Sequence, residues 1–242
     1  MSSVELTVYD KSGNEIDKLT VYTELLVEHI NSRLLHDAVV MYQSNLRQGS
    51  AKTKSRAEVA GHKKKMYKQK GTGNARAGHR RSGVRRGGGH IFAKRPRNWF
   101  FRLPSKALKK AARMAFVAKL NDAQVILIDT LAVDAPKTKE VVQILNALKI
   151  NETVLVAIEQ HNTNLYKSFR NIEGVRILPV SDLNAYEILR PKRLLMTRLA
   201  YESLVNSIIS PSDYEKKLNE LKSETATATG TGTGTEIVTP SP

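Results

Sequence analysis

Positive charge is concentrated in one segment of this chain. Between Leu46 and Arg113 the sequence has 22 lysines and arginines and one acid, Glu58, whereas the remainder has 17 basic and 22 acidic residues. Sixty-three consecutive residues, Val59–Asn121, contain no acid. Such a segment buries too little apolar surface to offset the ordering of its backbone, so alone it is expected to be disordered. A dense polyanion changes that balance because neutralised phosphates release counterions, and we therefore expect a nucleic acid as the partner.

The composition of the remaining chain is that of a globular protein. The sequence has 242 residues, of which 40% are hydrophobic, and this is enough for a core outside the basic segment. The absence of cysteine excludes disulfides, thiol nucleophiles and cysteine metal sites. Purely aliphatic runs such as Val154–Ile158 are too short to span a bilayer. We therefore expect a cytoplasmic protein without a membrane partner.

Hydrophobic periodicity predicts regular structure before the basic segment and none within it. Alternation over residues 4–8 and again over Glu15–Val21 predicts two strands joined by a turn, and helical spacing extends from Thr23 to about Asn45. From Gln48 to Arg97 neither period fits. A structureless stretch of about 50 residues is uncommon in a compact domain and argues against an ordinary loop.

A helix is predicted directly after the basic segment. Pro104 and Ser105 form a helix start, with Ser105 as the N-cap. Alanines and Leu108 recur at helical spacing over residues 107–118 and define one apolar face. Four cations share the opposite face, where they should point outward: Lys106, Lys109, Lys110 and Arg113.

Short aliphatic runs alternate with helical patterns in the C-terminal half. Strands are predicted at Gln124–Ile128, Thr153–Ile158, Val175–Val180 and Leu194–Thr197, and helices at Lys137–Leu148, Asn164–Asn171, Leu183–Leu189 and Ala200–Ser207. This rhythm predicts an α/β fold, a mostly parallel sheet with helices on its faces, plus a long extended basic loop. We expect residues 1–47 and 98–209 to form the globular domain, residues 48–97 an extended RNA-binding arm, and residues 223–242 a disordered Thr/Gly-rich tail.

The glycine motifs do not support a nucleotide site. Gly71–Gly78 has the wrong final spacing for a dinucleotide fingerprint, and Gly78 is followed by His79-Arg80, where a phosphate-binding loop requires Lys-Ser/Thr. Neither motif follows a predicted strand. The six histidines are scattered without acidic ligands at matching spacing, so no metal site and no cofactor is expected.

The basic segment combines the groups that bind RNA. Its cations suit phosphates, and flat side chains such as Tyr67 and Trp99 can stack on unpaired bases. Limbs of about 24 residues could reach on the order of 80 Å, beyond a body whose radius of gyration is about 16 Å. The residues predicted to bind RNA are Arg47, Lys52, Lys54, Arg56, Lys63, Lys64, Lys65, Lys68, Lys70, Arg76, Arg80, Arg81, Arg85, Arg86, Lys94, Arg95, Arg97, Lys106, Lys109, Lys110 and Arg113.

The motifs of this segment resemble a known family. The matching runs are Arg47-Gln48-Gly49, Lys54-Ser55-Arg56-Ala57-Glu58-Val59, Lys68–Gly78, Gly87–Gly89 and Phe92-Ala93-Lys94-Arg95-Pro96. Together with Ala135-Pro136-Lys137-Thr138-Lys139, their order and spacing are similar to large-subunit ribosomal protein four, over about residues 4–207. Two differences stand out: Met66-Tyr67 replaces the usual Pro-Trp pair of bacterial members, and Asn74 replaces a usual arginine.

The resemblance implies a non-enzymatic protein that binds 23S-type large-subunit ribosomal RNA early in assembly. It also implies that the arm's tip, near Lys65–Gly73, helps to form the polypeptide exit tunnel beside ribosomal protein twenty-two and meets the nascent polypeptide. Some relatives bind their own messenger RNA as well. The tip residues implied in this way are Tyr67, Gln69, Lys70, Gly71, Thr72 and Gly73, with Lys70 at the position where family members influence the macrolide response.

Two other functional classes are less well supported. A nuclease would need clustered carboxylates or a histidine pair beside the arm, and the sequence has neither there. A DNA-compacting protein could use the same charge but has no use for so long an arm. Competition between duplex DNA and structured RNA would separate this last class from an RNA-binding protein.

Overall fold

The computed structural model describes residues 3–27, 29–133 and 135–208, and the chain divides into two compact units. The first unit comprises Met1–Val40 with Leu103–Pro242, and the second comprises Met41–Arg102. The predicted Thr/Gly-rich tail, residues 223–242, lies outside the described residues.

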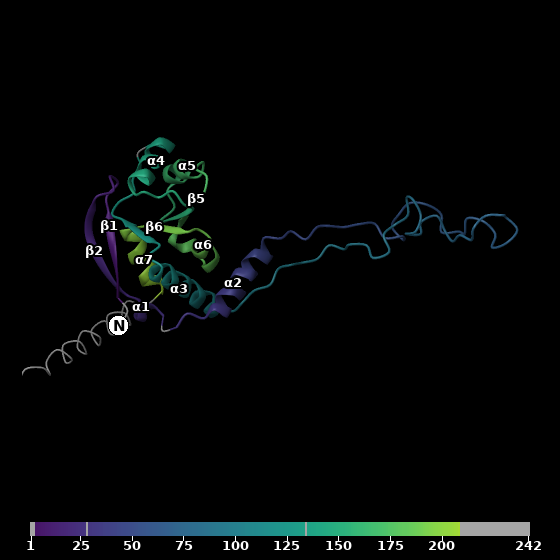
Figure 1. The fold of residues 1–242 in the computed structure, drawn as a ribbon, viewed down its shortest axis with the longest axis horizontal. Helices are drawn as coiled ribbons and strands as arrows, with labels where there is room; N and C mark the ends of the chain where they lie inside the picture. The colour runs from purple at the N-terminus through teal and green to yellow at the C-terminus, as the bar shows by residue number, and fades with distance from the viewer. Residues whose placement is uncertain (1–2, 28, 134, 209–242) are drawn as a thin grey trace, which may run out of the picture. The chain divides into compact units, whose positions relative to one another are not determined.

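The first unit is built on a six-stranded sheet with the order β2-β1-β3-β6-β4-β5 (Figure 1). The strands are β1 (Ser3–Tyr9), β2 (Glu15–Tyr22), β3 (Val125–Ile128), β4 (Val154–Ile158), β5 (Val175–Pro179) and β6 (Arg193–Thr197). β1 and β2 pair antiparallel, and every other neighbouring pair is parallel. The predicted α/β class with a mostly parallel sheet is confirmed.

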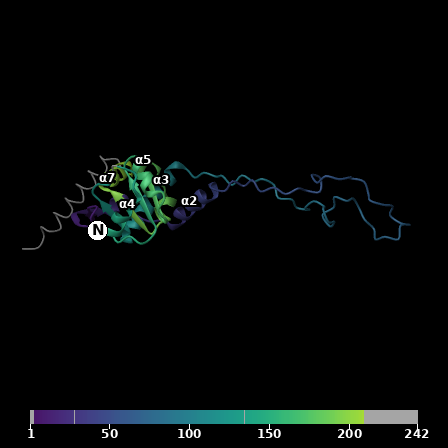
Figure 2. The same ribbon diagram turned by 90° about the horizontal axis from the view of Figure 1, so that it is seen from above.

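Helices cover both faces of this sheet (Figures 1 and 2). The helices of the described residues are α1 (Thr23–Leu26), α2 (Ser32–Asn45), α3 (Ser105–Asn121), α4 (Thr138–Ala147), α5 (Thr163–Phe169), α6 (Ala185–Leu189) and α7 (Arg198–Ile208), with a 3₁₀ turn at Val180–Asp182. Alternate residues of β4 face opposite cores: Leu155 packs with α3 and α7, whereas Val156 packs with α4 and α5. This explains why the strand is hydrophobic at every position, as expected for a sheet covered on both sides.

The predicted helix from Thr23 to Asn45 is in fact two helices. The backbone is already extended at Val27, which ends α1. The side chain of Asn31 then accepts hydrogen bonds from the backbone N–H groups of Arg33 and Leu34, at 3.0 and 3.2 Å. An asparagine in this role caps a new helix and competes with continuation of the old one, which is why periodicity alone missed the break.

The first turn of α3 also differs from the prediction. Pro104 occupies the N-cap, no side chain caps the helix, and Ser105 is the first helical residue. The apolar face is as predicted: Ala111 and Ala115 are fully buried against Ala38 of α2 and Ala185 of α6. Small side chains let these helices approach closely.

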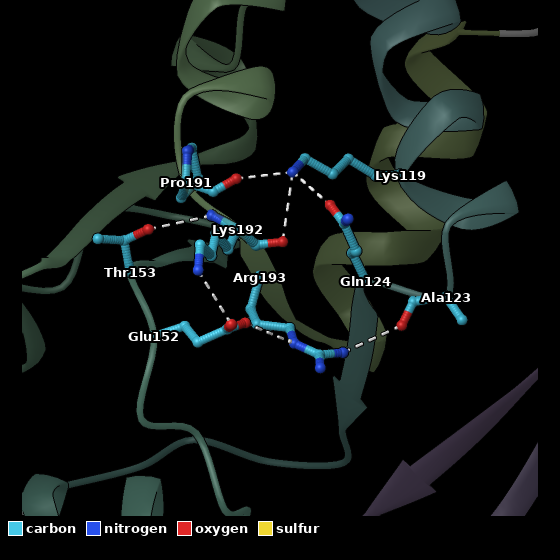
Figure 3. A network of polar contacts seen from close by, with 8 residues as sticks. All are labelled: Lys119, Ala123, Gln124, Glu152, Thr153, Pro191, Lys192 and Arg193. Atoms are coloured by element: carbon cyan, nitrogen blue, oxygen red, sulfur yellow. Dashed lines mark hydrogen bonds and ion pairs between the residues drawn. The ribbon is translucent and has the colours of Figure 1, made fainter.

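A buried lysine joins the end of α3 to the starts of the sheet strands (Figure 3). Lys119 is 6% exposed, and its ammonium donates to the carbonyl oxygen of Pro191 at 2.6 Å, that of Lys192 at 3.3 Å and Oε1 of Gln124 at 2.6 Å. Removal from water lowers the pKa of Lys119, and Arg193 lowers it further, whereas Asp122 acts in the opposite direction.

The neighbouring carboxylate of Glu152 pairs with the two cations that follow Pro191 (Figure 3). Lys192 Nζ lies 3.2 Å from Glu152 Oε1, and Arg193 Nε lies 3.3 Å from Oε2. Arg193 also donates to the carbonyl of Ala123 at 3.1 Å. The whole network therefore ties α3, the start of β3 and the start of β6 to the loop before β4.

Replacing Lys119 by methionine is expected to lower the free energy of unfolding by about 1–3 kcal/mol at neutral pH, because buried carbonyls lose their donor. The pKa of Lys119 is lowered in the fold, so the unfolded chain binds more protons just below the ordinary lysine pKa. The free energy of unfolding of the native protein must then rise with pH in that window, relative to that of the variant. The difference in free energy of unfolding between the two should therefore widen from about pH 8 to about pH 10.

Urea unfolding at both pH values measures this deficit. Lys106→Met is the matched control, because Lys106 is exposed on the same helix and its replacement should change stability little at either pH. A difference in free energy of unfolding that narrows as the pH rises would contradict a lowered pKa for Lys119.

Candidate nucleic-acid interface

The second unit is dominated by two limbs of extended backbone. Residues 46–102, all of them described, form no helix or strand and only two isolated bridges, Ser55 with His90 and Lys65 with His79. Figures 1 and 2 both show the limbs running side by side. The limbs are joined by backbone hydrogen bonds from Arg97 to Gly49, from Thr53 to Lys94, from His90 to Lys54 and from Met66 to Gly78, each of 3.0 to 3.1 Å.

The limbs begin at a stack of three side chains, Arg47, Trp99 and Arg97. The guanidinium carbons of Arg47 and Arg97 lie 3.8 and 4.1 Å from the centre of the Trp99 ring. A cation over an aromatic face is attracted by the quadrupole of the ring, so the indole holds two like charges close together. Gly49 fits beside them with a φ of +66°, and a Cβ there would lie 2.0 Å from the Arg97 carbonyl oxygen.

The last residues of α2 fix the backbone around Trp99. Ser44 Oγ donates to the carbonyl of Trp99 at 2.7 Å. The side-chain amide of Asn45 donates to the carbonyl of Phe101 at 3.1 Å and accepts from its N–H at 3.0 Å. The end of a regular helix therefore sets the geometry of the stack.

Arg81 braces the two limbs to each other farther along the arm. It is 9% exposed, and its guanidinium donates to the carbonyls of Ala57 and Val59 at 3.0 and 2.9 Å. Gly61 lies against its side chain, and a Cβ added at Gly61 would be 3.3 Å from Arg81 Cγ. Of the cations predicted to bind RNA, Arg81 is the one that the structure places inside the arm.

Most of the other predicted cations lie on the surface. Eighteen of the 21 are exposed, and Arg85 and Arg113 are half-buried. Lys106, Lys109 and Lys110 are exposed on α3, as predicted. Arg113 differs, because its Nε is buried and has no hydrogen-bond partner.

Neutralising groups are scarce around these cations. The one acid of the segment, Glu58, accepts from the N–H of Ser55 at 3.1 Å and lies 3.6 Å from Lys52 Nζ. The Ser55 hydrogen bond and then the charge of Lys52 hold the pKa of Glu58 below its ordinary value. This carboxylate is therefore ionised at neutral pH and already engaged with Lys52, and among the described residues it forms no ion pair with the other cations of the segment.

The predicted tip, Lys65–Gly73, is exposed apart from the half-buried Tyr67. Tyr67 donates its hydroxyl hydrogen to the carbonyl of Ala75, and Lys65 donates to the side chain of Gln69. Gly71 and Gly73 have φ values of +81° and +66°, with no atom within 4 Å of a Cβ added at either position. Such backbone favours glycine and leaves the surface of the turn bare.

Clusters of metal-ligating side chains are absent from the described parts of the chain. In residues 3–27, 29–133 and 135–208, no three histidine or carboxylate side chains come together as metal ligands would. Over the same ranges, no helix has the length and apolar character needed to cross a membrane. What the arm does present is a set of exposed cations around a single, already engaged acid.

Known proteins are similar to this chain over most of its length. The profile of the ribosomal protein L4/L1 family matches residues 19–207. The chain belongs to this family. "Large ribosomal subunit protein uL4" from Rhodopirellula baltica is 46% identical over 208 residues, which are 86% of this chain and 94% of that relative. Proteins of the same name from Symbiobacterium thermophilum and Dehalococcoides mccartyi are 40% and 41% identical over 80% and 81% of this chain, and each is covered to 94%.

The comparisons confirm the resemblance drawn from the basic motifs. They also confirm that the chain is a ribosomal protein and not an enzyme, because the family consists of structural proteins of the ribosome. Sequence analysis did not predict three features of the arm: the stack on Trp99, the hydrogen bonds of Arg81 between the limbs, and those of Asn45 with Phe101. Each joins residues far apart in the chain, and no local pattern marks such pairs.

Gly49→Ala is expected to disrupt the Arg47–Trp99–Arg97 stack, because the new Cβ would collide with the Arg97 carbonyl and with the indole. Trp99 is the single tryptophan of the chain, so its quenching by acrylamide measures the change directly. Quenching should increase in the variant.

Gly71→Ala is the matched control. It imposes a similar left-handed backbone penalty, but its Cβ meets nothing within 4 Å. Equal quenching in Gly49→Ala and the native protein would show that the stack does not depend on this glycine.

Proposed function

We propose that this protein is a structural constituent of the large subunit of the cytoplasmic ribosome, and that its arm, residues 48–97, binds large-subunit ribosomal RNA early in assembly. Membership of the ribosomal protein L4/L1 family and the names of its relatives support the place in the large subunit. The observation that supports RNA binding is the exposure of the arm's cations, next to a single and already engaged acid.

Extended limbs suit insertion between RNA helices better than binding to one flat surface. Each limb presents cations along its length, from Lys52 on one side to Lys94 on the other, and phosphates could meet them from several directions. Arginine is frequent on the returning limb, where its planar fork can hold a phosphate by two hydrogen bonds. The α3 cations Lys106, Lys109 and Lys110 add a second, helical set of phosphate contacts in the first unit.

The finer part of the proposal concerns the tip. We place Lys65–Gly73 at the narrow part of the polypeptide exit tunnel, beside ribosomal protein twenty-two and in reach of the nascent polypeptide, as the family resemblance implies. The bare glycines at 71 and 73 and the exposed Lys70 are suited to a wall past which a chain must slide. Binding to its own messenger RNA, as in some relatives, would use the same cations.

The arm should account for most of the salt dependence of RNA binding. If about ten cations engage phosphates, the slope of log affinity against log salt should be near −7 on the single-strand coefficient. Replacing Lys52–Arg95 by a short glycine linker should remove most of this slope yet leave the first unit folded, because the buried core clusters lie outside the deleted residues.

Filter binding at several salt concentrations gives the slope, and circular dichroism checks the fold. Sucrose-gradient sedimentation then tests whether the intact chain, and not the shortened one, fractionates with the large subunit. A full-length protein that sediments away from that subunit, or binds RNA with a slope shallower than about −3, would refute the proposal.

Lys70→Glu should change the macrolide response of the ribosome more than it changes subunit assembly. Lys70 is exposed beside Gly71, so its replacement should cost little folding stability, and one reversed charge among 22 should weaken RNA attachment only modestly. At a constriction the same reversal changes the local potential. Macrolide inhibition of translation by ribosomes that carry the variant should therefore shift, with normal yield of subunits.

Lys63→Glu serves as the control, because it reverses a charge that is also exposed but lies outside the predicted tip. An unchanged macrolide response together with failed subunit assembly in Lys70→Glu would make Lys70 an anchoring residue and would move the tip elsewhere.

A further inference from the structure

The arm contains a hollow of about 720 Å³. Binding of RNA phosphates along the arm does not require such a hollow. Its lining includes Met66 from one limb and Arg76, Arg80, Val84, Arg85 and Arg86 from the other. A volume of this size lies in the range of small-ligand sites, roughly 300–1,000 Å³.

Hydrogen bonds within the arm hold the walls of this hollow in place. Three successive turns follow from His79, in which Ser82 donates to His79 at 3.3 Å, Arg85 to Ser82 at 3.1 Å and Gly88 to Arg85 at 2.9 Å. Arg81, which braces the limbs, lies within these turns and points its buried guanidinium away to the carbonyls of residues 57 and 59. The N–H of Met66 donates to the carbonyl of Gly78 at 3.1 Å and holds the opposite wall.

The lining combines charge with apolar surface. Within the described residues, the guanidinium groups of Arg76, Arg80, Arg85 and Arg86 make no ion pair and no hydrogen bond to the protein, and Glu58 is engaged elsewhere. Val84 and Met66 are 90% and 46% exposed. A bare phosphate would satisfy the arginines but would leave these two apolar side chains in water.

From this lining we infer that the hollow receives one unpaired nucleotide of the bound RNA. Its base packs against Met66 and Val84, and the two phosphates that flank it in the RNA chain bind the four arginines. The inference rests on the proposed function, since it requires RNA on the arm. A nucleotide fits better than an acidic peptide, because guanidinium planes stack on bases and guanidinium forks bind phosphates.

The RNA probes separate the base from the phosphate. One hairpin carries a single bulged nucleotide in its stem, and its partner carries an abasic residue at the same place, so both have the same number of phosphates. The intact chain should bind the base-bearing bulge on the order of tenfold more tightly, since stacking of one base is worth roughly 1–3 kcal/mol.

Gly78 also lines the hollow, so Gly78→Leu fills it without changing the charge of the arm. The φ of Gly78 is not in the left-handed region, and a Cβ added there meets nothing within 4 Å. The leucine side chain should therefore be tolerated and occupy the open space. The variant should bind both hairpins with the affinity that the native chain has for the abasic one. Ala60→Leu adds a similar side chain at an exposed position of the arm outside the hollow and should keep the preference.

The possible outcomes separate this inference from the proposed function. Native protein that binds both hairpins tightly and equally overturns the nucleotide site but leaves RNA binding by the arm intact. A preference that survives in Gly78→Leu overturns the inference as well. Failure to bind either hairpin refutes both proposals. A glutamate peptide whose binding is weakened by Gly78→Leu would assign the hollow to acidic peptides and would also overturn the inference.

Discussion

Repulsion among cations limits how residues 46–113 can be held in any shape, because the segment offers a single carboxylate for its 22 lysines and arginines. The structure meets this constraint with neutral partners. Two guanidinium groups share the faces of Trp99, and Arg81 donates to two backbone carbonyls. Such contacts orient a cation without neutralising it, so the arm keeps its attraction for phosphate while its backbone is braced.

The first unit also holds a cation by backbone carbonyl oxygens, but in its core. Lys119 is buried at the end of α3 and is held by carbonyl oxygens of Pro191 and Lys192, not by a carboxylate. One face of α3 is packed against neighbouring helices through alanines, while the lysines at 106, 109 and 110 stay in solvent. A single helix thus contributes to the core, fixes the start of the sheet strands and carries charges of the same sign as those of the arm.

The sequence predicted those parts of the molecule that local patterns encode. Four parallel strands were found because each is a short aliphatic run between polar segments, and the surface of α3 followed from its helical period. The break between α1 and α2 was missed because it depends on one capping side chain, Asn31, whose neighbours are also helix-compatible. The stack on Trp99 and the hollow beside Arg80 arise where two limbs meet, and the pairing of those limbs leaves no periodic trace in a glycine-rich basic segment.

The hydrogen bond between Gly49 and Arg97 brings the two ends of the arm together at its base. A hairpin joined in this way can gain or lose residues on its limbs without moving either point of attachment. Its length is therefore open to evolutionary change independently of the α/β body, whose packing the inserted residues never enter. Insertion or deletion within the limbs could therefore change the length of the arm alone, while the body retains its packing.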